Sequence, residues 1–148
     1  YKFNFTELDN GIVFKDDNLT VEAFKVNHGE FEDAYGFRFT SKDKVIVFSG
    51  DTGPSKILED YAKDADILVH EVYSKAGFLK KTKDWQIYHK DHHTSTYEVG
   101  EIASRAKPKL LVLSHILFWG ADEQDILEET RTTFSGNIKI AEDLMVIK

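Results

Sequence analysis

The sequence has no cysteine, only two prolines and one methionine, and no long apolar run among its 148 residues. Without cysteine, disulfides and thiolate metal sites are excluded, so any bound metal must be held by histidine, aspartate or glutamate. The longest apolar run, at 110–119, is interrupted by Ser114 and His115. It is far shorter than the ~18 residues that a membrane span needs, so we expect no membrane association.

A basic excess is also lacking. The formal net charge is −7 and the isoelectric point is near 5.3. Proteins that bind the phosphate backbone usually carry a basic face, so nucleic acid is disfavoured as a partner. Apolar residues make up 41% and charged residues 30% of the chain, as in one ordinary soluble domain. A cytoplasmic location is favoured weakly. The sequence begins at Tyr1 without a signal-peptide pattern, and a mature exported chain would begin in the same way, so export stays open.

The first half of the chain is predicted to form strands. Its β-branched and aromatic runs are separated by short polar turns such as KDDN and SKDK, which is typical of antiparallel strands. The expected strands cover 11–15, 19–27, 35–40 and 44–50.

After Gly50 the pattern alternates between helices and buried strands. Apolar residues at helical spacing predict three helices, and Ser95 and Glu98 have the spacing of a capping box. The helices are expected over 55–65, 95–107 and 122–134, and short strands over 66–71, 109–115, 137–141 and 144–148. Antiparallel strands followed by this alternation predict an α/β fold of layered α+β character, with a mixed sheet and covering helices.

Three buried strands end in side chains that can bind metal or transfer protons. Asp51 follows the strand at 44–50, and Glu71 and His115 are the last residues of the strands at 66–71 and 109–115. Taken singly, Asp51 fits a turn, His115 a core histidine, and His28 a loop residue. Ligands of α/β sheets gather at the carboxyl ends of strands, and His and Asp are the ligands of a cysteine-free zinc site. We therefore expect the strand ends to converge in space.

Glu71 is expected to pair with a histidine. A carboxylate at a buried strand end must be paired or exposed. The segment YHKDHHTS supplies His89, His92 and His93, of which the first two also fit a solvated loop. A glutamate beside an imidazole is a common way to hold a proton donor.

Taken in order, the motifs resemble those of the metallo-β-lactamase fold hydrolases, within them the tRNase Z-like branch. VEAFKVNHGEFEDAYGFRF at 21–39 resembles the segment with the third-motif histidine, and VFSGDTGP at 47–54 resembles the fourth motif. ILVHEVY at 67–73 resembles the His-Glu-Ala-Thr element. The segment 93–115 resembles the His-Ser-Thr element that runs to the final histidine. The departures are Val-Tyr for Ala-Thr and threonine for serine.

This resemblance implies a centre of two divalent cations, expected to be zinc, with manganese or iron as alternatives. His28 would bind the first metal, Asp51 would bridge both, and His115 would bind the second. Glu71 and His93 would form the pair that protonates the leaving group. Such an enzyme would hydrolyse its substrate with water activated by the metals.

The family's N-terminal His-x-His-x-Asp-His motif does not occur in these 148 residues. The resemblance therefore implies that 1–148 is the C-terminal half of an αββα sandwich. The N-terminal half would be a partner, as another segment or a separate chain. An isolated half would expose its inner sheet, so a homo-oligomer is a further expectation.

The sequence favours a small substrate. Only the short turn TSKDK at 40–44 separates two predicted strands where tRNase Z enzymes carry a longer insert. With the acidic charge, this favours a small ester, lactone, sulfate or phosphoester over tRNA. A tRNA 3′-processing endonuclease and a non-catalytic half-domain that complements another subunit stay as alternatives. Phe118 and Trp119 could wall a substrate pocket, although core packing is the commoner aromatic role.

Overall fold

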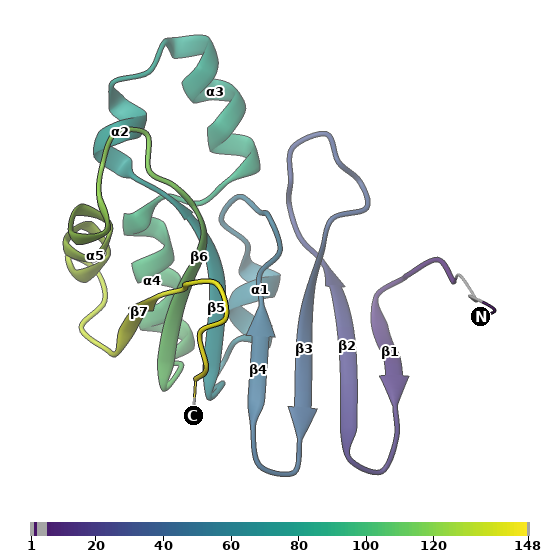
Figure 1. Cartoon of the computed structure of the whole chain (residues 1–148). Helices are drawn as coiled ribbons and strands as arrows, with labels where there is room; N and C mark the ends of the chain where they lie inside the picture. Colours follow the sequence, from purple (N-terminus) through teal and green to yellow (C-terminus); the bar gives the residue numbers. More distant parts are fainter. Residues whose placement is uncertain (1, 3–5, 148) are drawn as a thin grey trace.

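The computed structural model describes residue 2 and residues 6–147. Within them, seven strands form one sheet in which the strands lie side by side in sequence order (Figure 1). Strands β1 to β4 pair antiparallel, and β4 to β7 pair parallel. The strands are β1 (Gly11–Lys15), β2 (Leu19–Lys25), β3 (Tyr35–Ser41), β4 (Val45–Phe48), β5 (Ile67–Tyr73), β6 (Leu110–Leu117) and β7 (Ile138–Ile140).

The helices of the described residues follow β4, β5 and β6. Ser95 and Asp122 begin α4 and α5 with complete capping boxes, as the Ser95–Glu98 spacing predicts. The helices are α1 (Lys56–Tyr61), α2 (Lys75–Leu79), α3 (Lys83–His92), α4 (Thr96–Ala106) and α5 (Glu123–Arg131). The predicted α/β fold, a mixed sheet with covering helices, is therefore confirmed.

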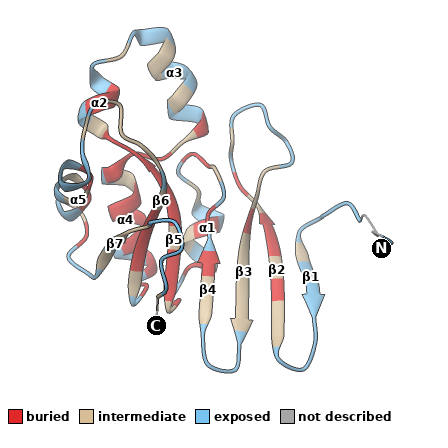
Figure 2. Ribbon diagram, in the orientation of Figure 1, coloured by how far each residue is buried: buried red, intermediate tan, exposed pale blue. Residues whose placement is uncertain are grey.

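The hydrophobic core lies between the sheet and helices α1, α4 and α5. Leu68 and Leu113, on neighbouring parallel strands, are fully buried there against Val99 and Ile102 of α4. Figure 2 shows this burial concentrated on β5, β6 and α4, whereas β1 is exposed. The core therefore fixes the parallel strands, whose carboxyl ends carry the candidate site.

The opposite face of the antiparallel strands carries a row of apolar side chains. The strand register places Phe14, Val21, Phe39 and Ile46 across four neighbouring strands on this face. Phe14 is 49% exposed and Phe48 is 42% exposed. Exposed aromatic side chains that share one face of a sheet are typical of a surface that takes part in protein contacts.

Helices α2 and α3 were not predicted from the sequence. They lie between β5 and α4 and stand beyond the carboxyl ends of the parallel strands (Figure 1). Their apolar residues Leu79 and Ile87 are mostly exposed, so the segment lacks a buried stripe that would reveal a helix. Glu129 of α5 holds the start of α2 by accepting hydrogen bonds from the backbone N–H groups of Lys75 (2.8 Å) and Ala76 (3.0 Å).

Several expected limits are wrong, and one expected strand is absent. Strands β2 and β4 end two residues before 27 and 50, and α1 ends four residues before 65. Strands β5 and β6 continue two residues beyond 66–71 and 109–115, because Val72 and Tyr73 pair with Ile116 and Leu117. The predicted strand at 144–148 is not formed over 144–147, and Lys148 lies outside the described residues. Leu144 is 99% exposed with a φ of 64°, so the chain turns there instead of adding a strand.

His70 is a fully buried histidine on the helix-facing side of β5. Its Nδ1 lies 2.6 Å from the Glu71 carbonyl oxygen, and its Nε2 has no hydrogen-bond partner among the described residues. Burial lowers the pKa of His70 from 6.5 to about 4. In the unfolded chain, His70 therefore becomes protonated near pH 6.5. In the folded chain, it becomes protonated only near pH 4.

We expect His70 to make the fold acid-sensitive. Its contribution to stability is complete above pH 6.5 and is lost as the pH falls towards 4, by up to about 3 kcal/mol. Chemical denaturation of the wild type and of His70→Leu, at a series of pH values between these limits, measures this loss. The variant should lose less stability over the interval. Equal losses in both proteins would contradict the assignment.

Candidate metal centre

Asp51 is delivered by a turn that only glycine permits. Strand β4 ends at Phe48, and Gly50 has a φ of +63°. A Cβ at Gly50 would lie 2.5 Å from the carbonyl oxygen of Tyr35, so a larger residue would both strain the turn and clash. Ser49 ties the turn to β5, because its hydroxyl accepts a hydrogen bond from the Glu71 backbone N–H (3.1 Å). The turn therefore fixes Asp51 beside Glu71.

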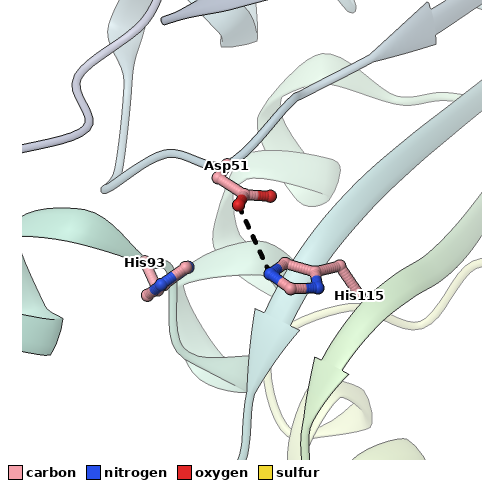
Figure 3. Close-up of side chains that lie close together, drawn as sticks. All are labelled: Asp51, His93 and His115. Carbon is pink, nitrogen blue, oxygen red and sulfur yellow. Dashed lines mark ion pairs between the residues drawn. The ribbon is translucent and has the colours of Figure 1, made fainter. Parts of the chain in front are cut away.

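His115 sits on a β-bulge rather than at the end of its strand. Ser114 pairs with Glu71 and Ile116 pairs with Val72, which leaves His115 as an extra residue in β6. Its φ is +43°, an uncommon conformation for a residue other than glycine. Bulges redirect a side chain, and strained backbone gathers at functional sites. The bulge lets the His115 Nε2 lie 3.3 Å from Asp51 Oδ2 (Figure 3).

His93 completes a cluster with these two side chains. Asp51, His93 and His115 each offer one ligand atom, and these atoms lie within 4.8 Å of one another (Figure 3). His93 follows directly after α3, and its N–H donates to the His89 carbonyl oxygen. Two imidazoles and a carboxylate are a donor set suited to Zn²⁺, Mn²⁺ or Fe²⁺. The residues therefore fit the divalent metal that the sequence implies.

His28 lies beside this cluster but outside it. Its ring centroid is 5.3 Å from that of His93, and its Nδ1 is 2.7 Å from the carbonyl oxygen of His92. An Nδ1–H that donates to this carbonyl leaves the Nε2 lone pair free, which is how metal-binding histidines are usually held. Gly29 allows the His92 ring to lie next to the backbone that follows His28, since a Cβ at Gly29 would lie 2.2 Å from that ring. The prediction that His28 is a metal ligand stays a prediction.

Glu71 and His93 lie together, as the sequence indicates. Glu71 Oε2 is 3.3 Å from His93 Nδ1, and Glu71 Oε1 accepts a hydrogen bond from the Thr94 N–H at 2.6 Å. Burial, with a smaller contribution from the nearby charge of Asp51, raises the pKa of Glu71 to about 9. Burial also lowers the pKa of His93. Each group therefore disfavours its charged form, and the two facing atoms, Glu71 Oε2 and His93 Nδ1, have no hydrogen-bond partner among the described residues.

The two aromatic residues after His115 have different surroundings. Trp119 packs against Tyr73 (ring centroids 5.2 Å apart) and against Trp85 (4.3 Å). Phe118 packs against the core and also lines a pocket of about 350 Å³ that includes His115. Phe118 therefore matches the expected pocket wall, whereas Trp119 takes the packing role.

A comparison with known families agrees with this arrangement. Residues 2–116 match the family model described as the beta-lactamase superfamily domain. The chain therefore belongs to the beta-lactamase superfamily. The metallo-beta-lactamase fold protein YhfI from Bacillus subtilis superposes with a TM-score of 0.69 at 23% identity, over 87% of this chain and 49% of that one. The short form of human tRNase Z gives a TM-score of 0.64 at 24% identity, over 93% and 46%. The predicted metallo-β-lactamase fold is confirmed.

Curated relatives place the chain near the tRNase Z-like branch, as predicted. A protein named Ribonuclease Z from Archaeoglobus fulgidus is 35% identical over 72% of this chain and 33% of its own length. Another of that name, from Bacillus velezensis, is 26% identical over 99% of this chain and 62% of its own length. The chain thus spans between a third and two thirds of the length of these relatives.

In the described part of the chain, no helix is both long and apolar enough to cross a membrane.

Proposed function

We propose that this chain supplies the metal-binding and proton-donating half of a metal-dependent phosphodiesterase that acts on RNA. The observation that carries the proposal is the meeting of Asp51 and His115, 3.3 Å apart, with the buried pair of Glu71 and His93. Asp51 and His115 can hold a cation, and the adjoining Glu71 and His93 can hold a proton. The relatives named Ribonuclease Z support RNA as the substrate class.

Each residue has a distinct part in this proposal. Asp51 and His115, with His28 beside them, would hold divalent metal, preferably zinc. A cation held there acts as a Lewis acid and lowers the pKa of a bound water. The Nδ1 of His93 faces Glu71, so its other ring nitrogen is the atom that would protonate the leaving oxygen. Glu71 would hold and replenish that proton.

We propose that a second segment with the His-x-His-x-Asp-His motif completes the centre. Two observations support this. Phe14 and Phe48, on the face of β1 to β4 away from the core, are 49% and 42% exposed, and a covering layer would bury them. The chain also spans only 33% to 62% of the curated relatives quoted above. The segment could be part of the same polypeptide or a separate chain, and its sheet would pack on the exposed row.

A small ester, lactone, sulfate or phosphoester is the second candidate substrate. The β3–β4 turn is tightly closed, because the Ser41 N–H donates to the Lys44 carbonyl oxygen at 2.9 Å. The turn thus leaves no long arm for a large substrate. The alignment with the Bacillus velezensis relative extends over 199 positions, so that protein carries residues that this chain of 148 lacks. The net charge of −7 also favours a small substrate over a polyanionic RNA.

The test compares substrate classes on one preparation. The protein, produced with its complementary segment and loaded with Zn²⁺ or Mn²⁺, is offered a tRNA precursor with a 3′ extension, bis(p-nitrophenyl) phosphate, a phenyl ester, a lactone and an aryl sulfate. We expect metal-dependent cleavage of both phosphodiesters, with the RNA preferred. Cleavage of the ester or lactone alone would overturn the proposal in favour of the second candidate.

A further inference from the structure

Helix α3 has two chemically different faces. Trp85, Tyr88, His89 and His92 lie on the face towards the metal centre, where Tyr88 stacks on His92 with ring centroids 4.0 Å apart. His92 in turn lies 5.1 Å from the ring of His28. The other face, at helical spacing, consists of Lys83, Gln86, Ile87 and Lys90. One helix, roughly 10 Å across, therefore separates this second face from the metal centre.

The second face of α3 lines a pocket. The pocket has a volume of about 450 Å³, and Lys75 of α2 closes it together with Lys83 and Lys90. Phe78 and Ile87 supply an apolar floor. A concave site of this size, mostly apolar with a few convergent charges, is of the kind that holds small ligands or a unit of a larger one.

The lysines of the pocket are not neutralised. Among the described residues, no carboxylate forms an ion pair with any of the three. Glu98 also lines the pocket, but its carboxylate accepts a hydrogen bond from the Ser95 N–H at 3.1 Å as part of a helix cap. The segment 75–92 contains five lysines and two aspartates in a chain whose net charge is −7. The pocket is therefore a local basic site on an acidic protein.

We infer that this pocket binds one nucleotide unit of a single-stranded polynucleotide whose cleaved bond lies at the metal centre. Ammonium groups bind phosphate as point charges, so the three lysines would hold a backbone phosphate. The base would rest on the Ile87 side of the apolar floor, because Ile87 is 65% exposed whereas Phe78 is 6% exposed and has the Lys75 ammonium 5.2 Å from its ring centre. A positively charged groove beside apolar or aromatic side chains is the usual means of binding single strands. The inference rests on the proposed phosphodiesterase function, because it identifies the strand in the pocket with the substrate.

The test measures binding without cleavage. Fluorescence anisotropy of a labelled single-stranded RNA, with EDTA present, is recorded at several salt concentrations for the wild type and for Lys83→Gln/Lys90→Gln. Both lysines are exposed, so the variant should fold normally. We expect binding to weaken roughly tenfold at low salt, and the slope of log K against log salt to become shallower by up to ~0.7, the value for one phosphate on a single strand.

The matched control is Lys15→Gln/Lys42→Gln, which removes the same charge from exposed lysines of β1 and the β3–β4 turn. A pocket variant that binds RNA as well as the control does would overturn the inference. So would competition by inorganic phosphate as strong as that by a mononucleotide, because the apolar floor would then have no role. If RNA binding depends on the two lysines but no phosphodiester is cleaved by the metal-loaded protein, the pocket stands and the proposed function fails.

Discussion

Asp51→Asn is expected to remove metal binding and hydrolysis together. The carboxylate is the only negatively charged member of the cluster it forms with His93 and His115. Asparagine keeps the size of the side chain but loses the charge that attracts a divalent cation. Even residues that only support a metal ligand typically cost ~10- to 100-fold in affinity or activity, so a direct ligand should cost at least ~100-fold.

The fold should survive this substitution. The Asp51 side chain is 45% exposed, and its Oδ2 lies 3.3 Å from the Nε2 of His115. Metal content after gel filtration and the rate of phosphodiester cleavage measure the effect, and the melting temperature reports on folding. Asp43→Asn, at an exposed position in the β3–β4 turn, is the matched control and should behave as the wild type. Retention of both metal and activity by Asp51→Asn would rule out the aspartate as a ligand.

The position of Asp51 could be predicted because local sequence determines it. A buried strand, a glycine that alone fits the turn, and the following Asp leave few ways to place the carboxylate. The same is true of the capping box at Ser95, which fixes the start of α4 three residues after His93. The presence of most strands and of three of the five described helices follows from such short-range patterns, and these elements were therefore predicted from the sequence.

The position of His115 could not be predicted in the same way. An apolar run gives no sign that one of its residues is extruded as a bulge, since the bulge depends on the register between β5 and β6. Helix α3 was missed because tertiary contacts hold it. Its histidines meet aromatic residues of distant segments edge to face, such as His92 with Phe31, whose ring centroids are 6.0 Å apart. Closeness of His93 to both Asp51 and His115 likewise arises only in the folded chain.

This closeness leaves two roles for His93, and substitution separates them. If His93 is the proton donor, His93→Ala should retain its metal while losing activity. If it is a metal ligand, the same variant should lose both. We expect the first result, because the family resemblance assigns His93 to proton transfer together with Glu71, whose Oε2 lies 3.3 Å from the His93 Nδ1. Metal analysis of His93→Ala beside His115→Ala, which should lose metal, decides between the roles.

Glu71→Gln is expected to lower the cleavage rate by ~10²- to 10⁴-fold with metal content unchanged, because the loss falls on proton transfer alone. Glutamine preserves the fold, since its side-chain oxygen can still accept the hydrogen bond from the Thr94 N–H. It cannot exchange a proton with His93. If the two residues act as a unit, Glu71→Gln should add little to the loss already caused by His93→Ala. Rates of the two single variants and the double variant form the cycle, and fully multiplicative losses would show that Glu71 acts elsewhere.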